Sequence, residues 1–559
     1  MNIERKILFR NSPARMRAAI ARRPFLLRCL VAMIVWGAIV VIFSGCMSFF
    51  AVPDDAKYKP RLISPSPSMS DAVAEGDEAH APAAFSGITP EVPVNVSIEE
   101  AVLLAMENNR NLVMQRLAPE VARTFEEEAQ SVFDPVLSAS ITEGRSRVEE
   151  DDGAEKRLQT TDVLAGLSQF FPTGTDIHAE LSTGRNDTSS YPRYETRAGI
   201  TATQALLAGR GIEPNLALLR QARIDTLVSE YELQGFAEDL VARVEITYWE
   251  YVLARRQVEI YQGSLELAEQ QLAETRHRIR VGGLAETDLA AAQAEVALRT
   301  EALINANGRV NRLRVRLLKL IHPIGLAAID TELTPQSMPV VPEEGPDDLN
   351  AHLDLAMRMR PDLRQAGLLL DRGDLDLVLT RNGLLPRMDL FIRLGKTGYA
   401  DSFGRSAENI DGDGYDIVGG LEFFMPVANR AAQARHRRAV LSQRQSVESL
   451  ENIRDLIRED IKIAYIETLR TRQQVDATAA TRKFQEEKLR AETAKFRVGK
   501  STSLHVAQAQ RDLVTSQVAE VEAITGFLIA MIELYRFEGS LLARRGISIF
   551  GSSAAMDRP

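Results

Sequence analysis

Cysteine is almost absent from the 559 residues, where only Cys29 and Cys46 occur. Since one lies in a predicted signal and the other at its end, the mature chain has no disulfide and no cysteine-based metal site. Enzyme motifs are lacking too: there is no Gly-rich phosphate loop, no HExxH and no nucleophile elbow, and the seven histidines are scattered. We therefore predict a protein that is not an enzyme and has no cofactor or bound metal.

Net positive charge is concentrated at the beginning of the chain. Residues 1–28 hold eight Arg or Lys and one acid, giving +7, so the rest carries −17 within a total of −10. Phosphate binding needs clustered basic surface, and an acidic body therefore argues against nucleic acid as a partner.

A secretory signal is predicted over residues 1–46. The basic start is followed by an apolar run at residues 29–43, which at about 15 residues is short for a membrane span of about 20. The run ends in Phe43-Ser44-Gly45-Cys46, which resembles a bacterial lipobox, so that Cys46 is the expected lipidation site and first mature residue. The alternative is an uncleaved inner-membrane anchor. Residues 47–96 are expected to form an extended linker.

The rest of the chain contains an internal sequence repeat. Leu104-Ala105-Met106 returns as Leu355-Ala356-Met357, and Pro135 returns as Pro386, both at an offset of 251. Arg280-Val281-Gly282 returns as Arg497-Val498-Gly499 at an offset of 217, so the first copy holds 34 additional residues between these landmarks. This predicts two repeats, at residues 97–340 and 341–541, with a C-terminal tail at 542–559.

Each repeat begins with a helix and continues into strands. Ser97 and Glu100 form a capping box for a helix predicted over residues 97–131. After each repeated proline the apolar residues alternate, which predicts strands at about 136–208, 387–396 and 415–427, with an extra hairpin near 160–190. Such alternation fits membrane-barrel strands, and the alternative is a half-buried soluble sheet. Residues 409–414 look like the start of a calcium loop, but Gly420 replaces the bidentate acid, so we predict a hairpin turn.

Very long helices follow the strands. Residues 215–280 contain no proline and are expected to extend for about 100 Å, and residues 430–497 form a similar segment. Both turn at glycines and return as residues 287–320 and 502–540. Periodic segments of this length are typical of coiled coils or helical arrays.

Taken together, residues 95–540 resemble the TolC family of outer-membrane factors. The most specific elements are Arg280-Val281-Gly282-Gly283-Leu284 through Thr287-Asp288-Leu289, Arg497-Val498-Gly499 through Thr502, and the tandem helix–strand–helix order. The resemblance implies an α+β membrane protein, mostly α, whose long antiparallel coiled-coil helices form a periplasmic α-barrel. It also implies a homotrimer in which each subunit gives four strands to a twelve-stranded transmembrane β-barrel.

The resemblance also assigns roles to the two helical turns. They become periplasmic tips that meet an adaptor protein and, through it, an inner-membrane pump. The implied docking residues are Val281, Gly282, Leu284, Thr287, Val498, Gly499 and Thr502. The alternative is that the glycines only permit tight turns.

The family often carries aspartate rings at the periplasmic entrance. The matching positions here are His505 and Gln508, with Asp288 on the other tip. Since neither His505 nor Gln508 is acidic, a strong cation gate is not expected. One hypothesis is a ring of three His505 side chains that responds to pH, and the alternative is a solvated helix-face histidine.

The predicted function is therefore the outer-membrane channel of a tripartite efflux or type I secretion system, a passive duct from periplasm to exterior. The alternative is a lipid-anchored periplasmic coiled-coil protein without a channel.

Overall fold

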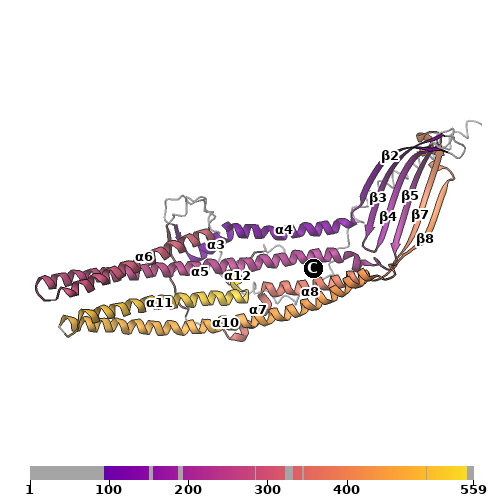
Figure 1. The fold of residues 1–559 in the computed structure, drawn as a ribbon. Helices are drawn as coiled ribbons and strands as arrows, with labels where there is room; N and C mark the ends of the chain where they lie inside the picture. The colour runs from indigo at the N-terminus through magenta and orange to yellow at the C-terminus, as the bar shows by residue number, and fades with distance from the viewer. Residues whose placement is uncertain are drawn as a thin grey trace, which may run out of the picture. The chain divides into compact units, whose positions relative to one another are not determined.

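The computed structural model describes residues 94–149, 155–186, 193–283, 285–321, 332–342, 345–498 and 500–549, all within the unit that spans residues 60–559. The predicted signal and Cys46 lie outside the described residues. Figure 1 gives the order of the elements.

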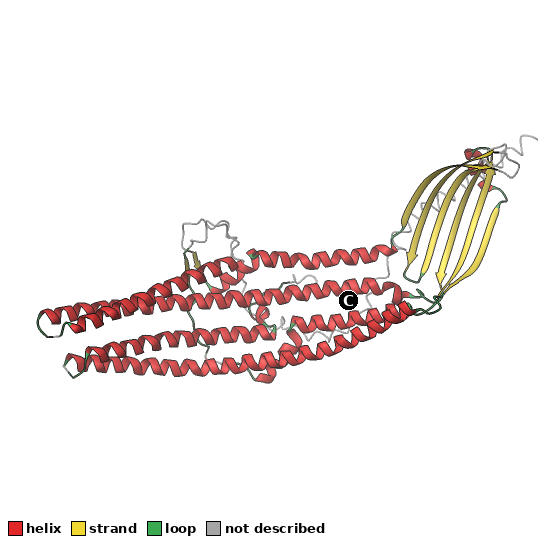
Figure 2. Cartoon of the chain, in the orientation of Figure 1, coloured by secondary structure: helices red, strands yellow, loops and turns green. Residues whose placement is uncertain are grey.

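Two long helical hairpins dominate the described chain (Figure 2). The first joins α5 (Ile212–Arg280) to α6 (Thr287–Ile321), and the second joins α10 (Arg430–Arg497) to α11 (Ser503–Glu538). At 69 and 68 residues, α5 and α10 each extend for about 100 Å. These helices agree closely with the segments predicted from the sequence.

Shorter helices extend this layer toward the strands. They are α3 (Ile98–Asn108), α4 (Arg110–Gln130), α7 (Leu349–Met359) and α8 (Pro361–Asn382), and a last short helix is α12 (Leu541–Arg544). Next to the strands the packing order is α4, α5, α8, α10, whereas toward the hairpin turns it is α6, α5, α11, α10. The helical region is therefore one layer of four helices, both next to the strands and toward the hairpin turns.

The single helix predicted over residues 97–131 was wrong at Asn109. The Asn109 backbone is extended, with ψ at 115°, and its Oδ1 accepts hydrogen bonds from the N–H groups of Asn111 (3.0 Å) and Leu112 (3.2 Å). Asn109 thus ends α3 and caps α4. In the second copy the break falls at Arg360, where Pro361 begins α8.

The strands form one antiparallel sheet in the order β2-β3-β4-β5-β7-β8. Their bounds are β2 (Val136–Glu149), β3 (Glu155–Phe171), β4 (Thr175–Asn186), β5 (Arg193–Ala205), β7 (Arg387–Ala400) and β8 (Tyr415–Phe424). The TolC resemblance implies four strands per chain, whereas this sheet has six, because β3 and β4 form a further hairpin between β2 and β5. The β7–β8 connection contains α9 (Phe403–Glu408) and η4 (Asn409–Asp411), and is thus more than the simple turn predicted.

Short links join the helices to the sheet. Only η2 (Ser131–Phe133) and two further residues separate α4 from β2, and the β5–α5, α8–β7 and β8–α10 links are similarly short. The Asn215 side chain donates hydrogen bonds to the carbonyl oxygens of Pro172 (3.0 Å) and Gly209 (2.8 Å), which fixes the β3–β4 turn to the start of α5. All four link ends therefore lie at the same end of the sheet.

The apolar core lies where α3 packs on α5, away from the strands. It includes the fully buried Tyr248 and Tyr251 of α5. The two-stranded parallel sheet of β1 (Val94–Val96) and β6 (Leu333–Pro335) covers this core. Tyr248 donates a hydrogen bond to the Val96 carbonyl oxygen (3.0 Å), and Tyr251 donates one to that of Leu333 (2.7 Å). The buried hydroxyls are thus satisfied by the small sheet.

Candidate functional site

The six-stranded sheet has one apolar face. In an antiparallel pair, directly opposed residues point to the same side, so the register assigns each side chain to a face. One face carries large apolar side chains on every strand, all of them exposed: Leu137, Ile141, Val163, Leu167, Ile177, Leu181, Ile200, Leu390, Ile392, Leu394, Ile417, Leu421 and Phe423. Leu137 and Ile141 are each 78% exposed. We call this the apolar face. An apolar surface that extends over all six strands is what contact with lipid requires.

The opposite face, which we call the polar face, is mostly Ser, Thr, Gly and charged residues. Its described side chains include three arginines and seven carboxylates: Arg197, Arg387, Arg393, Asp162, Asp176, Glu180, Glu195, Asp389, Asp416 and Glu422. Among these described side chains, seven negative charges outnumber three positive ones. A face of this composition can border water and favours cations near it.

Ion pairs cross the strands on the polar face. Nη2 of Arg197 on β5 lies 2.8 Å from Oδ2 of Asp416 on β8, although β7 runs between them. The residue beneath this pair is Gly395 of β7, where an added Cβ would collide with the Asp416 carboxylate and lie 2.8 Å from Nη2 of Arg197. Nε of Arg197 also lies 3.6 Å from Oε1 of Glu180 on β4. Glycine at position 395 therefore permits one salt-bridge network over four strands.

The strands have the dimensions and end residues of membrane strands. Each contains at least 10 residues, and a tilted strand needs about 9–11 to cross the apolar core of a bilayer. On the apolar face, Phe171 and Phe423 stand near the helix-linked end, and Tyr194 and Tyr415 stand near the far end. Aromatic residues at both ends of an apolar band are typical of outer-membrane barrels.

Both sides of the described wall end in open edges. Within the described sheet, β2 pairs only with β3 and β8 pairs only with β7, so neither edge strand has a neighbouring strand on its outer side. In lipid, unpaired backbone groups at a sheet edge are costly, and closure removes them. Since β2 and β8 run in opposite directions, β8 of one copy can extend β2 of another in antiparallel register.

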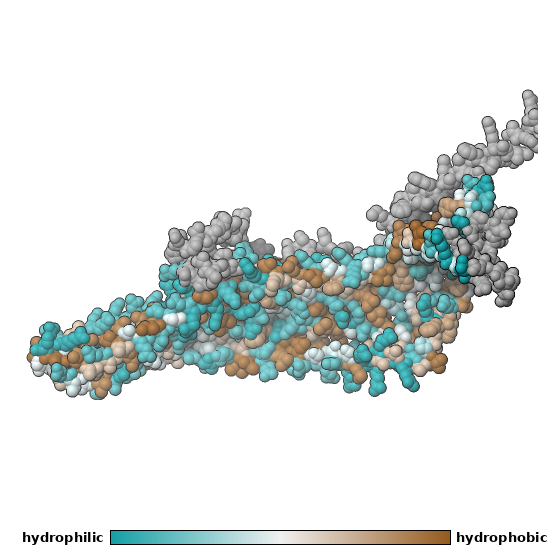
Figure 3. Space-filling model, turned by 45° about the horizontal axis from the view of Figure 1, so that its top comes forward, coloured by the Kyte–Doolittle hydropathy of each residue, from teal (hydrophilic) through white to brown (hydrophobic). Residues whose placement is uncertain are grey.

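The helical layer shows similar edges. Among its described contacts, α4 packs on α5 but meets no helix on its other flank, where Met114, Leu117, Val121 and Phe125 are exposed at three- and four-residue steps. On the opposite edge, α10 exposes Leu441, Leu456, Ile463 and Ile466. Figure 3 shows apolar residues interspersed among polar ones along the helices. We infer that these stripes meet in an assembly of several copies.

The α5–α6 tip contains predicted docking residues at exposed positions. Val281 is 67% exposed, and Gly282 follows it with φ at 77°. The N–H of Gly282 donates to the Ile279 carbonyl oxygen (3.0 Å) and ends α5, while Thr287 begins α6. No atom lies within 4 Å of a Cβ built on Gly282, so the backbone conformation, and not crowding, favours glycine there.

The α10–α11 tip is built alike. Val498 is 69% exposed, and the Thr502 hydroxyl accepts a hydrogen bond from the His505 N–H (3.4 Å) as the N-cap of α11. The Arg278 guanidinium lies 4.9 Å from the ring centre of Phe496, which links the two tips. Leu284 and Gly499 lie outside the described residues.

The predicted entrance residues His505 and Gln508 line one shallow groove of about 620 Å³ together with Lys488, Glu492, Arg511 and Asp512. Lys488 pairs with Asp512 across the hairpin (2.7 Å), and hydrogen bonds from Lys495 and Ser501 lower the pKa of Glu492. Asp288 lies in the first turn of α6, on the other tip. His505 is thus exposed among two acids and two bases.

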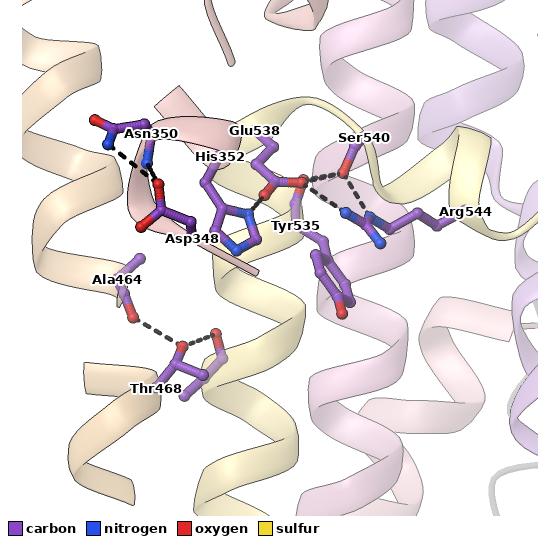
Figure 4. A network of polar contacts seen from close by, with 10 residues as sticks. Asp348, Asn350, His352, Ala464, Thr468, Tyr535, Glu538, Ser540 and Arg544 are labelled. Atoms are coloured by element: carbon purple, nitrogen blue, oxygen red, sulfur yellow. Dashed lines mark hydrogen bonds and ion pairs between the residues drawn. The ribbon is translucent and has the colours of Figure 1, made fainter. Parts of the chain in front are cut away.

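A buried polar network, which the sequence did not reveal, joins the α7 and α11 ends (Figure 4). His352 and Glu538 are 2% and 0% exposed, and Nδ1 of His352 contacts Oε1 of Glu538. The other carboxylate oxygen accepts a hydrogen bond from the Ser540 hydroxyl (2.6 Å) and pairs with Arg544 (3.4 Å). The network fixes the end of α11 to α7. The sequence did not reveal it because His352 and Glu538 lie 186 residues apart in the chain.

A related contact in the first half ties the C-terminal segment to α5. Nε and Nη2 of Arg545 donate to the two oxygens of Glu245 at 2.6 and 2.8 Å. Nearby, the Leu542 N–H donates to Glu238, yet burial outweighs this bond and raises the pKa of Glu238 to about 7. The described part of the tail is therefore an integral part of the helical layer.

None of the helices in the described ranges is both long and apolar enough to cross a membrane.

Comparison with known proteins supports the resemblance. The family model for outer membrane efflux protein matches residues 352–540, which is the second repeat. Outer membrane efflux protein BepC of Brucella suis is 22% identical over 390 residues, covering 69% of this chain and 81% of BepC.

Solved channels share the fold. The outer-membrane channel OprN superposes with a TM-score of 0.62 at 18% identity, over 79% of this chain and 89% of OprN. The CmeC outer membrane channel of Campylobacter jejuni gives a TM-score of 0.62 at 14% identity, over 79% and 86% of the two chains. The predicted mostly helical, TolC-like fold is confirmed. The second repeat therefore matches the outer membrane efflux protein family, and the described chain has the fold of these solved outer-membrane channels.

Proposed function

We propose that three copies of this chain close one continuous wall around water, with six strands from each in the outer membrane and the helical layers in the periplasm. The protein is an outer membrane efflux channel that extends into the periplasm, and not an enzyme. The observation that carries the trimeric arrangement is the sheet with one apolar face, one polar face and two open edges. A single copy leaves those edges unpaired in lipid.

Purified protein in planar bilayers tests this proposal. We expect heat-modifiable trimers and single-channel currents. The competing function, a lipid-anchored coiled-coil spacer, shares the long helices but predicts neither channel currents nor protection of the strands by lipid. Stable monomers without current would overturn the proposal.

The two exposed tips are proposed to dock a periplasmic adaptor, which connects to an inner-membrane pump. Val281 and Val498 present apolar side chains to solvent on adjacent turns, beside Gly282, Thr287 and Thr502. Leu284 and Gly499 complete the proposed set on sequence grounds. The bare turn at Gly282 supports close approach of a partner backbone as well as the turn itself.

Matched valine substitutions test docking. Val281→Asp with Val498→Asp is expected to abolish export in cells while leaving trimer yield and single-channel current unchanged. Val340→Asp provides the control, because Val340 is 72% exposed and belongs to neither tip. Unchanged export in the double variant, or equal loss in the control, would remove the tips from the proposed interface.

The entrance is proposed to respond to pH through His505. Lys488, Glu492, Arg511 and Asp512 face the same groove, so protonation of His505 adds a positive charge beside two acids and two bases. Trimers are expected to conduct differently at pH 5 and pH 8, and His505→Ala is expected to reduce that difference. If the pH response is the same in both proteins, His505 is only a solvated side chain of α11.

Lipidation of Cys46 is proposed from the lipobox-like Phe43-Ser44-Gly45-Cys46. Palmitate labelling in cells is expected for the natural chain and not for Cys46→Ser. Label retained by the variant, or absent from both proteins, would contradict this assignment.

A further inference from the structure

The β3–β4 hairpin has the pairing of a wall element. Val136–Glu149 of β2 pair with residues 155–168 of β3. Thr160–Phe171 of β3 pair with Thr175–Asn186 of β4. β4 in turn pairs with β5 along its whole length, from Thr175 to Asn186. With hydrogen bonds on both flanks, the hairpin is not a plug or a loop folded over the sheet.

The hairpin also continues both faces of the sheet. Leu167 and Leu181 lie on the apolar face, in line with Leu137 on β2 and Ile200 on β5. Glu180 lies on the polar face and reaches Arg197 of the next strand. A one-residue slip would exchange the two faces, so the hairpin sequence is matched to this place in the wall.

The width of the helical layer can be compared with the width of the sheet with and without β3 and β4. Four packed helices at 8–10 Å spacing occupy an arc of about 32–40 Å per chain. Strands about 4.8 Å apart and tilted by about 40° each occupy about 6 Å of circumference. Four strands therefore cover about 25 Å and six cover about 38 Å, so the six-stranded sheet matches the width of the four helices to which its ends are linked more closely than four strands would.

We propose that three copies close an eighteen-stranded barrel whose bore is as wide as the helical tunnel below it. This inference rests on the proposed trimeric channel and concerns its width. Barrel diameter grows about linearly with strand number, so eighteen strands give about 1.5 times the diameter of twelve. The membrane section then does not limit the size of the hydrated solute, and selection by size belongs to the periplasmic tips.

Polymer exclusion in single channels tests the width. Polyethylene glycols of graded size are added only on the barrel side of oriented trimers, and the largest polymer that still reduces the current is recorded. The variant lacks residues 155–186, which removes β3 and β4 but keeps the strand directions of β2 and β5. We expect the natural barrel to admit polymers of about 1.5-fold larger radius than the variant. The same polymers added at the tip side serve as an internal control, since both proteins have identical tips.

Equal barrel-side cut-offs in the two proteins would overturn the inference while leaving the channel function intact. Absence of trimers or current in the natural protein would instead overturn the proposed function. If the deletion prevents assembly, electron cryomicroscopy of the natural trimer in lipid nanodiscs decides the question. Eighteen strands in the wall support the inference, and twelve strands with β3–β4 outside it contradict the inference.

Discussion

A single arginine on the apolar face distinguishes a membrane wall from a soluble sheet. Ile200 lies near the middle of β5 and is 54% exposed on that face. An arginine on the lipid side of a barrel costs about 2–4 kcal/mol at the bilayer midplane. Ile200→Arg repeats the cost in each copy, so a trimer is expected to lose about 6–12 kcal/mol.

The neighbouring residue supplies the control. Thr201 points to the polar face, opposite Arg393 of β7, so Thr201→Arg adds the same side chain to the water-lined side. Both variants are refolded into lipid vesicles, and the yield of heat-modifiable trimer and the urea midpoint are measured. We expect a large loss for Ile200→Arg and a small one for Thr201→Arg. Equal losses, or the reverse order, would refute the assignment of the faces.

Three further predictions follow from particular contacts. Burial raises the pKa of Glu238 to about 7, so the folded chain holds this proton more tightly than the unfolded chain does. The free energy of unfolding, measured with urea, should therefore fall by about 3 kcal/mol as pH rises from 4.5 to 7. Glu238→Gln should not show this loss. Gly395→Val places its side chain against Asp416 and Arg197 and is expected to cost about 1–3 kcal/mol in trimer stability, whereas an unchanged urea midpoint would show that the network yields freely. Reversal potentials in a KCl gradient should show a preference for cations that Glu422→Gln weakens, because acids outnumber arginines on the polar face; anion preference would contradict the lumen assignment.

The sequence was sufficient for the long helices. It predicted residues 430–497 as one helix, and α10 has the same bounds, because a proline-poor periodic segment has few competing structures. The prediction of an unbroken helix over residues 97–131 failed because the side chain of Asn109 competes for backbone N–H groups. The corresponding break at Arg360 has a clearer signal in Pro361, and comparing the two repeats could have revealed the first.

The order of the strands in the six-stranded sheet was harder to predict than the strands themselves. Alternation identified strands after Pro135 and Pro386, but the order of six strands depends on pairing between the two repeats, such as Ile200 with Leu394. Alternation in one strand carries no information about its neighbours. The same holds for the contact of His352 with Glu538, 186 residues apart. Docking and entrance residues came from resemblance, and their roles stay predictions.

The near absence of cysteine permits a direct test of closure by disulfide cross-linking. One new cysteine is scanned over residues 138–142 of β2, and a second is placed at Val418 of β8. These strands form opposite edges of the sheet, with four strands between them, so a bond joining them must link different copies. We predict that one scanned pair gives a covalent trimer under oxidising conditions in the outer membrane. Monomers alone at every scanned position would contradict a wall closed by three copies.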